Sequence, residues 1–157
     1  MSDKNQLDEY DKKILTYLQE DSSISNIDLS KKIGLAPSSC LLRTKNLRES
    51  GIIKQFTTIL DDKKLGYEVT AFAKVALSPL NRETSHKFIE EANSIPQIVE
   101  CYTITGDCAY LLKVYAKDLK FYRDFVIDKL MAIPGVSHVE TMMVVGVEKQ
   151  TTAIPLE

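Results

Sequence analysis

The stretch between residues 37 and 50 carries side chains whose chemistry suits nucleic acid. Serine hydroxyls and the Asn46 amide can hydrogen-bond to base edges in a DNA major groove, whereas lysine and arginine pair with phosphates. On a helical wheel, Cys40, Thr44 and Leu47 share one side, which would pack on the rest of a domain. The polar residues then face outward together with Leu42, which could contact a thymine methyl group. The candidate DNA contacts are Lys31, Ser38, Ser39, Leu42, Arg43, Lys45 and Asn46.

Positive charge is concentrated around the same stretch. The whole chain has a net charge of -2, which does not by itself indicate a nucleic-acid binder. Between Lys31 and Lys54, however, six basic residues stand against the single acid Glu49, so this segment is locally +5. A solvated helix surface is the alternative interpretation, since any exposed helix is polar. The spacing of the preceding turn favours the DNA interpretation.

Two short helices joined by a tight turn are predicted to position these side chains. Ser25 and Asp28 form a capping-box pattern at the start of the first of them. Gly34 can adopt the left-handed conformation that ends it, and Pro37 suits the first position of the next helix. Ile27, Leu29 and Ile33 would give the first of the two a buried side, and an earlier helix is expected over residues 8–20. This layout is that of a helix-turn-helix.

The second half of the chain alternates between strand-like and helical patterns. Strands are predicted over residues 67–77, 98–105, 108–116 and 136–147, and helices over 82–93 and 118–131. Gly106 and Asp107 suit a tight hairpin between the two middle strands. Ile95-Pro96-Gln97-Ile98 and Ile133-Pro134-Gly135-Val136 repeat at corresponding helix-to-strand junctions. The order βαββαβ with this internal repeat predicts a ferredoxin-like antiparallel sheet with both helices on one face.

The predicted organisation is therefore an α+β chain of two domains. Residues 1–51 form a winged-type helix-turn-helix domain, 52–66 a linking strand and hinge, and 67–157 a ferredoxin-like domain for effector binding and oligomerisation. The alternate apolar positions of the strands indicate that a second copy covers the open sheet face. They are Ala71, Ala73, Val75, Leu112, Val114, Val145 and Val147. A symmetric dimer would present two reading helices to a pseudopalindromic site.

Cysteine usage and hydropathy bear on the cellular compartment. The chain has three cysteines without CxxC spacing, each within an apolar stretch, which favours buried reduced thiols over disulfides or metal ligands. It has no apolar run near 18 residues and no charged-then-apolar amino terminus. We therefore expect a cytoplasmic protein without a metal or cofactor.

Short motifs along nearly the whole chain match one family in order and spacing. They are Leu7-Asp8, Asp11, Ile14-Leu15, Ser25-Asn26, Leu29-Ser30, Gly34-Leu35, Cys40-Leu41, Arg43, Leu47, Gly51-Ile52-Ile53, Glu100-Cys101, Gly106-Asp107, Tyr110-Leu111-Leu112-Lys113, Tyr122-Arg123, Pro134-Gly135-Val136 and Glu148-Lys149-Gln150-Thr151-Thr152. On these residues the sequence resembles the Lrp/AsnC (leucine-responsive, feast/famine) transcription regulators. The resemblance implies an effector domain of the RAM/ACT-like type, dimers that assemble into octamers or similar particles, and a small effector, often an amino acid, bound between dimers.

The resemblance also implies an effector pocket around the Gly106-Asp107 loop. The matching positions are Cys101, Thr103, Thr105, Gly106, Asp107, Tyr110, Thr141 and Val144. Backbone N–H groups of such a loop can hold a carboxylate, and an aspartate can accept from an ammonium group. Family members often carry a second aspartate two residues later, where this chain has Ala109, which leaves open another ligand or none.

We therefore predict a sequence-specific DNA-binding regulator of transcription whose activity or assembly responds to a small effector. A DNA-organising protein without an effector is the first alternative. An enzyme resembling the sirohaem decarboxylases related to this family is the second, but only His86 and His138 could supply imidazole chemistry. The chain is accordingly expected not to be an enzyme, and its expected partners are double-stranded DNA, a small molecule and further copies of itself.

Overall fold

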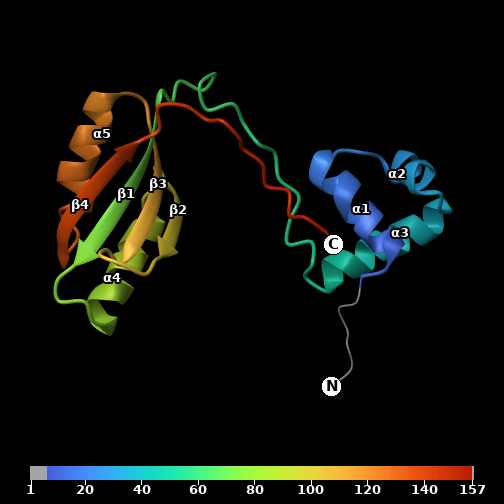
Figure 1. The fold of residues 1–157 in the computed structure, drawn as a ribbon, viewed down its shortest axis with the longest axis horizontal. Coiled ribbons are helices and arrows are strands. Elements are labelled where there is room, and N and C mark those ends of the chain that lie inside the picture. Colours follow the sequence, from blue (N-terminus) through green and yellow to red (C-terminus); the bar gives the residue numbers. More distant parts are fainter. Residues whose placement is uncertain (1–6, 157) are drawn as a thin grey trace. The chain divides into compact units, whose positions relative to one another are not determined.

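A computed structural model describes residues 7–156, which form two compact units (Figure 1). The chain up to Ile59 and the residues from Lys149 on make one unit, here called the helical unit. Residues Leu60–Glu148 make the other, the sheet unit. The carboxy-terminal residues thus group with the amino-terminal helices in this structure; the division into domains at residues 51 and 67 stays a prediction.

Three helices build the helical unit: α1 (Glu9–Glu20), α2 (Asn26–Ile33) and α3 (Pro37–Glu49). Their apolar sides meet in a core of six buried residues, Ile14, Leu15, Leu29, Ile33, Cys40 and Leu47. Ile27, predicted to be buried, is instead 56% exposed because it lies on the outer side of α2. The helix-turn-helix predicted from the sequence is confirmed.

The helix ends follow the predicted local chemistry with one difference. Ser25 Oγ accepts from the backbone N–H of Asp28 at 3.1 Å, but it also donates to the Asp28 carboxylate instead of leaving that group to cap the backbone. Gly34 adopts the left-handed conformation with φ 72°, which ends α2. Pro37 begins α3, whose N-cap Ala36 makes no side-chain hydrogen bond.

No strand is formed between α3 and the sheet unit. Residues 52–60, predicted to be a wing or linking strand, begin with a bend at Ile52 and Ile53 and pair with no strand within residues 7–156. Ile53 is fixed to the helical unit because its N–H donates to Leu47 O at 3.0 Å and its side chain packs on the helical core. A turn over residues 62–66 then leads into the sheet unit.

The sheet unit has the predicted βαββαβ order. Its strands are β1 (Val69–Leu77), β2 (Ile98–Thr103), β3 (Tyr110–Ala116) and β4 (Val136–Met143), arranged as β2-β3-β1-β4 with every neighbouring pair antiparallel. Helix α4 (Arg82–Ser94) follows β1, and α5 (Leu119–Phe125), which continues as the π-helical turn η1 (Val126–Leu130), follows β3. Both helices cover one face of the sheet (Figure 1), so the ferredoxin-like fold is confirmed.

The alternate apolar strand residues lie beneath the helices. Ala71, Ala73, Val75, Leu112 and Val114 are each fully buried, in one core with Phe88 of α4 and Leu130 of η1. The sequence analysis predicted from these residues that a second copy covers the open face of the sheet. Because the helices of the same chain already bury them, they do not support that prediction. Strand β4 also ends at Met143, so Val145 and Val147 lie outside the sheet and are exposed.

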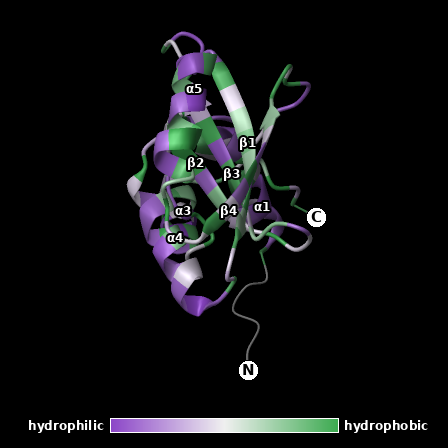
Figure 2. Cartoon of the chain, turned by 90° about the vertical axis from the view of Figure 1, so that its left-hand side faces the viewer, coloured by the Kyte–Doolittle hydropathy of each residue, from purple (hydrophilic) through white to green (hydrophobic). Residues whose placement is uncertain are grey.

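The open face of the sheet mixes half-buried aromatic residues with paired charges. Phe72, Leu111 and Tyr115 alternate with Lys74 and Lys113 across β1 and β3. Lys74 Nζ lies 3.3 Å from a Glu140 carboxylate oxygen, and Lys113 Nζ lies 3.2 Å from one of Glu100. In Figure 2 the outer surface of α4 is largely hydrophilic, in keeping with a solvated helix over a buried core.

Candidate nucleic-acid interface and ligand loop

Helix α3 carries the predicted reading surface on its outer side. Ser38, Ser39, Leu42, Lys45 and Asn46 are all exposed, as the helical wheel predicts, because Cys40 and Leu47 anchor the opposite side in the core. Leu41, which the sequence did not single out, is 59% exposed beside Leu42 at 58%. Two exposed leucines among polar groups are suited to contact thymine methyl groups.

The turn before α3 is held by a side chain that the sequence analysis did not use for this purpose. Asn26 Nδ2, at the start of α2, donates to the Pro37 carbonyl at 2.9 Å. This bond joins the first turns of the two helices and so fixes the angle at which α3 leaves the turn. The sequence predicts this bond only weakly, because an asparagine next to a capping serine does not indicate which distant backbone group it contacts.

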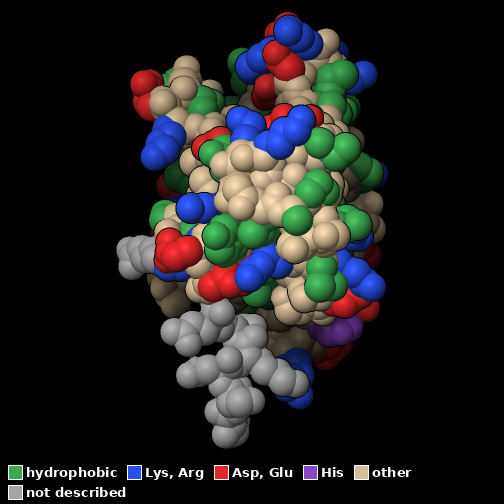
Figure 3. Space-filling model, turned by 90° about the vertical axis from the view of Figure 1, so that its right-hand side faces the viewer, with side chains coloured by type: hydrophobic (Ala, Val, Ile, Leu, Met, Phe, Trp, Pro, Cys, Tyr) green, Lys and Arg blue, Asp and Glu red, His purple; other side chains and the backbone are tan. Residues whose placement is uncertain are grey.

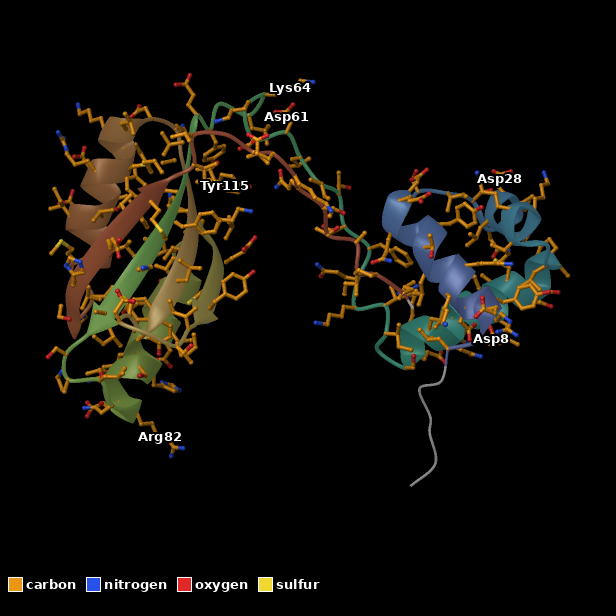
Figure 4. All side chains as sticks on the ribbon, viewed as in Figure 1. Asp8, Asp28, Asp61, Lys64, Arg82 and Tyr115 are labelled. Atoms are coloured by element: carbon orange, nitrogen blue, oxygen red, sulfur yellow. The ribbon has the colours of Figure 1, made fainter. Side chains whose placement is uncertain are left out.

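Arg43 is engaged by two carboxylates of α1. Its Nη1 donates to Asp8 Oδ2 at 2.6 Å and to Asp11 Oδ1 at 2.8 Å (Figure 4 labels Asp8 at the beginning of α1). These hydrogen bonds raise the pKa of Arg43, with Asp11 contributing most. The pKa of Asp8 is lowered, chiefly by the N–H of Asp11 and then by Arg43. Arg43 therefore joins α3 to α1, a role different from the predicted phosphate contact.

Other cations on this unit remain available to phosphates. Lys31 and Lys45 have side chains 73% and 65% exposed, and each is paired only loosely with a carboxylate, at 3.8 Å to Asp28 and 3.6 Å to Glu49. Such exposed pairs contribute little and exchange readily. Arg48 is also exposed, with its guanidinium carbon 5.6 Å from the centre of the Phe56 ring. In Figure 3, which faces the helical unit, basic side chains border an apolar and uncharged centre.

A groove of about 590 Å³ runs along the side of α3 that faces the beginning of α1. It is lined in part by Ser39, Leu42 and Asn46 of the reading surface and by Leu7 and Ile52. Ser39 and Asn46 thus lie on the flank of α3 that borders this groove, together with Asp11 of α1, whereas Leu41 and Arg48 do not line it.

The ligand loop predicted around Gly106 is longer than a two-residue hairpin. Residues 104–109 connect β2 to β3, and Ile104 N donates to Ala109 O at 3.0 Å. Gly106 has φ 124°, a conformation that favours glycine. The exposed Asp107 lies with a carboxylate oxygen 4.0 Å from Lys74 Nζ. The pKa of Lys74 is raised, mainly by its hydrogen bond with Glu140 and then by Asp107.

The other predicted effector residues do not gather at this loop within one chain. Cys101, Thr103 and Tyr110 lie on the helix-covered face, where Tyr110 is only 3% exposed under the Phe88 ring. Thr141 lies on the same face but on β4, and its Oγ1 is 3.0 Å from the Tyr122 hydroxyl of α5. Because β2 and β4 are the two edges of the sheet, about 14 Å separates them.

Two further predicted positions complete the set. Thr105 is exposed in the loop, whereas Val144 follows β4 and donates its N–H to Thr70 O at 2.9 Å. The eight predicted positions are therefore spread over β2, β3, the loop between them, β4 and the residue that follows β4.

Residues 7–156 contain no group of three His, Cys, Asp or Glu side chains that could hold a metal ion. Cys40, Cys101 and Cys108 are free, and burial raises the pKa of each thiol. Within the same residues, no helix is long and apolar enough to cross a membrane.

Comparison with known proteins matches a family model to each of two successive parts of the chain. Residues 7–54 match a family described as winged helix-turn-helix DNA-binding, and residues 70–154 match one described as the Lrp/AsnC ligand binding domain. The transcriptional regulator AzlB of Bacillus subtilis is 61% identical over 96% of both chains. The leucine-responsive regulatory protein of Escherichia coli is 32% identical over 96% of this chain and 92% of its own.

A solved structure is similar over nearly the full length. The transcriptional regulator NMB0573 of Neisseria meningitidis, crystallised as its L-Met complex, superposes with a TM-score of 0.93 at 31% identity, covering 96% of this chain and 97% of its own.

Proposed function

The chain belongs to the Lrp/AsnC family of transcriptional regulators, and on that premise we propose that it binds specific DNA sequences through α3 and responds to a small effector of the amino-acid class. The observation that carries the DNA part is the outward side of α3. There the hydroxyls of Ser38 and Ser39, the amide of Asn46 and the cation Lys45 are exposed together on a helix anchored from behind.

The roles of the reading residues follow from their chemistry. Ser38, Ser39 and Asn46 read base edges, and Leu42 contacts a thymine methyl group. Lys31 and Lys45 hold phosphates, because both are exposed and only weakly paired. Arg43 contributes indirectly, since its bonds to Asp8 and Asp11 hold α3 against α1.

The assembly we propose is a homodimer that associates further, to octamers or similar particles. The open sheet face supports it, because half-buried Phe72 and Tyr115 lie there beside charges that are already paired, so little polar surface would lose its partners in a contact. Two copies would place two α3 helices on one DNA site, and a pseudopalindromic site would match their symmetry.

The effector site we propose lies at the loop of residues 104–109. Lys74 and Asp107 bring opposite charges within 4.0 Å at this loop, a pairing that matches the carboxylate and ammonium groups of an amino acid. The L-Met complex of the similar Neisseria protein supports a ligand of this class. Because Thr141 and Val144 lie at the β4 edge while Cys101 and Thr103 lie at the β2 edge, the pocket would be completed by a neighbouring subunit. The protein would act in the cytoplasm.

Screening the amino acids by thermal shift tests the effector proposal, since a ligand that prefers the folded state raises the melting temperature. We expect one or a few amino acids to stabilise the wild-type protein and to do so less for Asp107→Asn. Asp124→Asn is the matched control, because Asp124 is an ion-paired carboxylate on α5, away from the loop. No stabilisation by any amino acid would contradict this part of the proposal.

Binding to short duplexes of different sequence tests the DNA proposal. Tight binding should be confined to a subset of sequences, and Asn46→Ala should reduce that selectivity by weakening the preferred sites most. Equal affinity for unrelated duplexes would contradict sequence-specific reading and would favour a DNA-organising protein.

A further inference from the structure

The carboxy-terminal residues pack on the helical unit through a specific pair of hydrogen bonds. The side-chain amide of Gln19, in the last turn of α1, donates from Nε2 to Ile154 O at 3.1 Å. In return, Ile154 N donates to Gln19 Oε1 at 2.6 Å. Leu156 is half-buried and packs against the helical core. Two polar contacts and one apolar contact therefore hold the tail on α1.

The carboxamide of Gln19 is suited to bind a backbone peptide group. A glutamine carboxamide has the same donor and acceptor as a peptide group, so Gln19 and Ile154 exchange two bonds as neighbouring strands do. Glutamate at this position would keep an acceptor and lose the donor. The arrangement therefore uses the full hydrogen-bonding capacity of this side chain toward one residue of the tail.

We propose that residues 149–156 are a clasp that belongs to the helical unit and binds the last turn of α1. Just after the end of β4, Val144 is still bonded to β1, because its N–H donates to Thr70 O at 2.9 Å. Residues 145–153 are thus the only chain between a fixed point of the sheet and Ile154. The other connection runs over residues 54–68, from the packed Ile53 to the start of β1, and is the longer of the two.

The clasp and the reading helix act on the same element. Arg43 of α3 is bonded to the first turn of α1, and Gln19 lies in its last turn. A helical unit restrained by both connections loses less orientational freedom when it binds DNA than one restrained by residues 54–68 alone. Its affinity for DNA is therefore expected to be higher. The clasp is also the shorter route by which a ligand-dependent change near Thr141 or Val144 would reach α1. This consequence for DNA rests on the function proposed above, whereas the clasp itself does not.

Hydrogen–deuterium exchange of the full-length protein tests the clasp. In the wild type, the Ile154 amide should exchange more slowly than its exposed neighbours in the tail. Gln19→Ala should accelerate that exchange about tenfold, because it removes both bonds. Glu20→Ala is the matched control: Glu20 is the next residue of α1, is exposed, and its side chain makes no hydrogen bond or ion pair with any of residues 7–156. Leu156→Ser should resemble Gln19→Ala.

The same variants, titrated with a 25-base-pair duplex, test the coupling to DNA. Gln19→Ala should weaken binding about threefold or more at every salt concentration without changing the salt dependence, because no phosphate contact is lost. Unprotected Ile154 in the wild type, or equal exchange in Gln19→Ala and Glu20→Ala, would overturn the clasp. Faster exchange with unchanged DNA affinity would overturn the coupling. If the wild type bound no DNA, the proposed function would fail, and exchange alone would decide the clasp.

Discussion

Replacing Lys45 by alanine should reduce the salt dependence of DNA binding. Lys45 lies on the outer side of α3, with its side chain 65% exposed and its ammonium group 3.6 Å from a Glu49 carboxylate oxygen. That loose pair is expected to open in favour of a DNA phosphate, because exposed pairs contribute little to stability. The substitution removes one phosphate contact from each copy and leaves the helix core intact.

The size of the effect follows from the exposed cations of the helical unit. If Lys31, Lys45 and Arg48 each neutralise one phosphate, two copies release counterions at about six positions, and the logarithm of affinity falls with that of salt concentration with a slope of about −5.4. Between 50 and 200 mM salt, affinity would fall about two thousandfold. Lys45→Ala would change the slope to about −3.6 and this loss to about 150-fold.

Fluorescence anisotropy with a labelled duplex measures both slopes, and the operator need not be known, because phosphate contacts do not depend on sequence. Lys64→Ala is the matched control. Lys64 is 85% exposed and loosely paired, 3.7 Å from Asp61, but it lies in the turn that enters the sheet unit (both residues are labelled in Figure 4). It should leave the slope unchanged.

Equal slopes for Lys45→Ala and the wild type would refute the assignment of Lys45 as a phosphate contact. A change of the same size in Lys64→Ala would show that total charge controls binding, so that the outward side of α3 would lose its special role. Loss of affinity at all salt concentrations with an unchanged slope would instead indicate a damaged fold.

Three further substitutions test the structural roles. Arg43→Ala should lower the melting temperature of the helical unit and weaken DNA binding, because α3 loses its bonds to α1; unchanged melting with lost DNA binding would make Arg43 a direct phosphate contact. The folded-state pKa of Asp8 lies below its ordinary value of 3.8, so its stabilising effect is present above that pH and is lost as pH falls through the folded value. Asp8→Asn should therefore flatten the acid end of the melting-temperature profile, and a parallel profile would contradict this. Gly135→Ala should destabilise the sheet unit by about 1–3 kcal/mol, since φ is 91° and the new Cβ would lie 3.2 Å from Thr84 Cγ2; Gly146→Ala, with its nearest atom at 3.6 Å, should melt like the wild type.

The local chemistry of the chain was readable from the sequence. Capping by Ser25, the left-handed Gly34 and the initial Pro37 each involve residues within one turn, so the helix-turn-helix and its outward side could be predicted without distant contacts. Alternation over Ala71, Ala73 and Val75 likewise predicted a strand with a shared face. It did not predict what covers the apolar face, because period-two alternation is the same whether helices of the same chain or a partner subunit cover it.

The role of Arg43 and the division of the effector residues depended on tertiary structure. Arg43 meets Asp8 and Asp11 only because α1 and α3 cross at that point. Cys101 and Thr141 were both predicted to line the effector pocket but lie on opposite edges of the sheet, since the strand order places β3 and β1 between them. The spacing of residues along the chain predicts neither where two helices cross nor the order of strands in a sheet.

What the sequence determined by itself is therefore the set of elements and the family, through short-range capping, periodicity and motif order. What only the tertiary structure decided is which side chains share a surface. The tail shows the difference most clearly: Gln19 and Ile154 are far apart in the sequence, and no pattern in either segment predicts that the last residues fold onto the first helix. The reason is physical, because a single carboxamide-to-peptide contact has no periodicity and exists only once the folded chain brings the tail to α1.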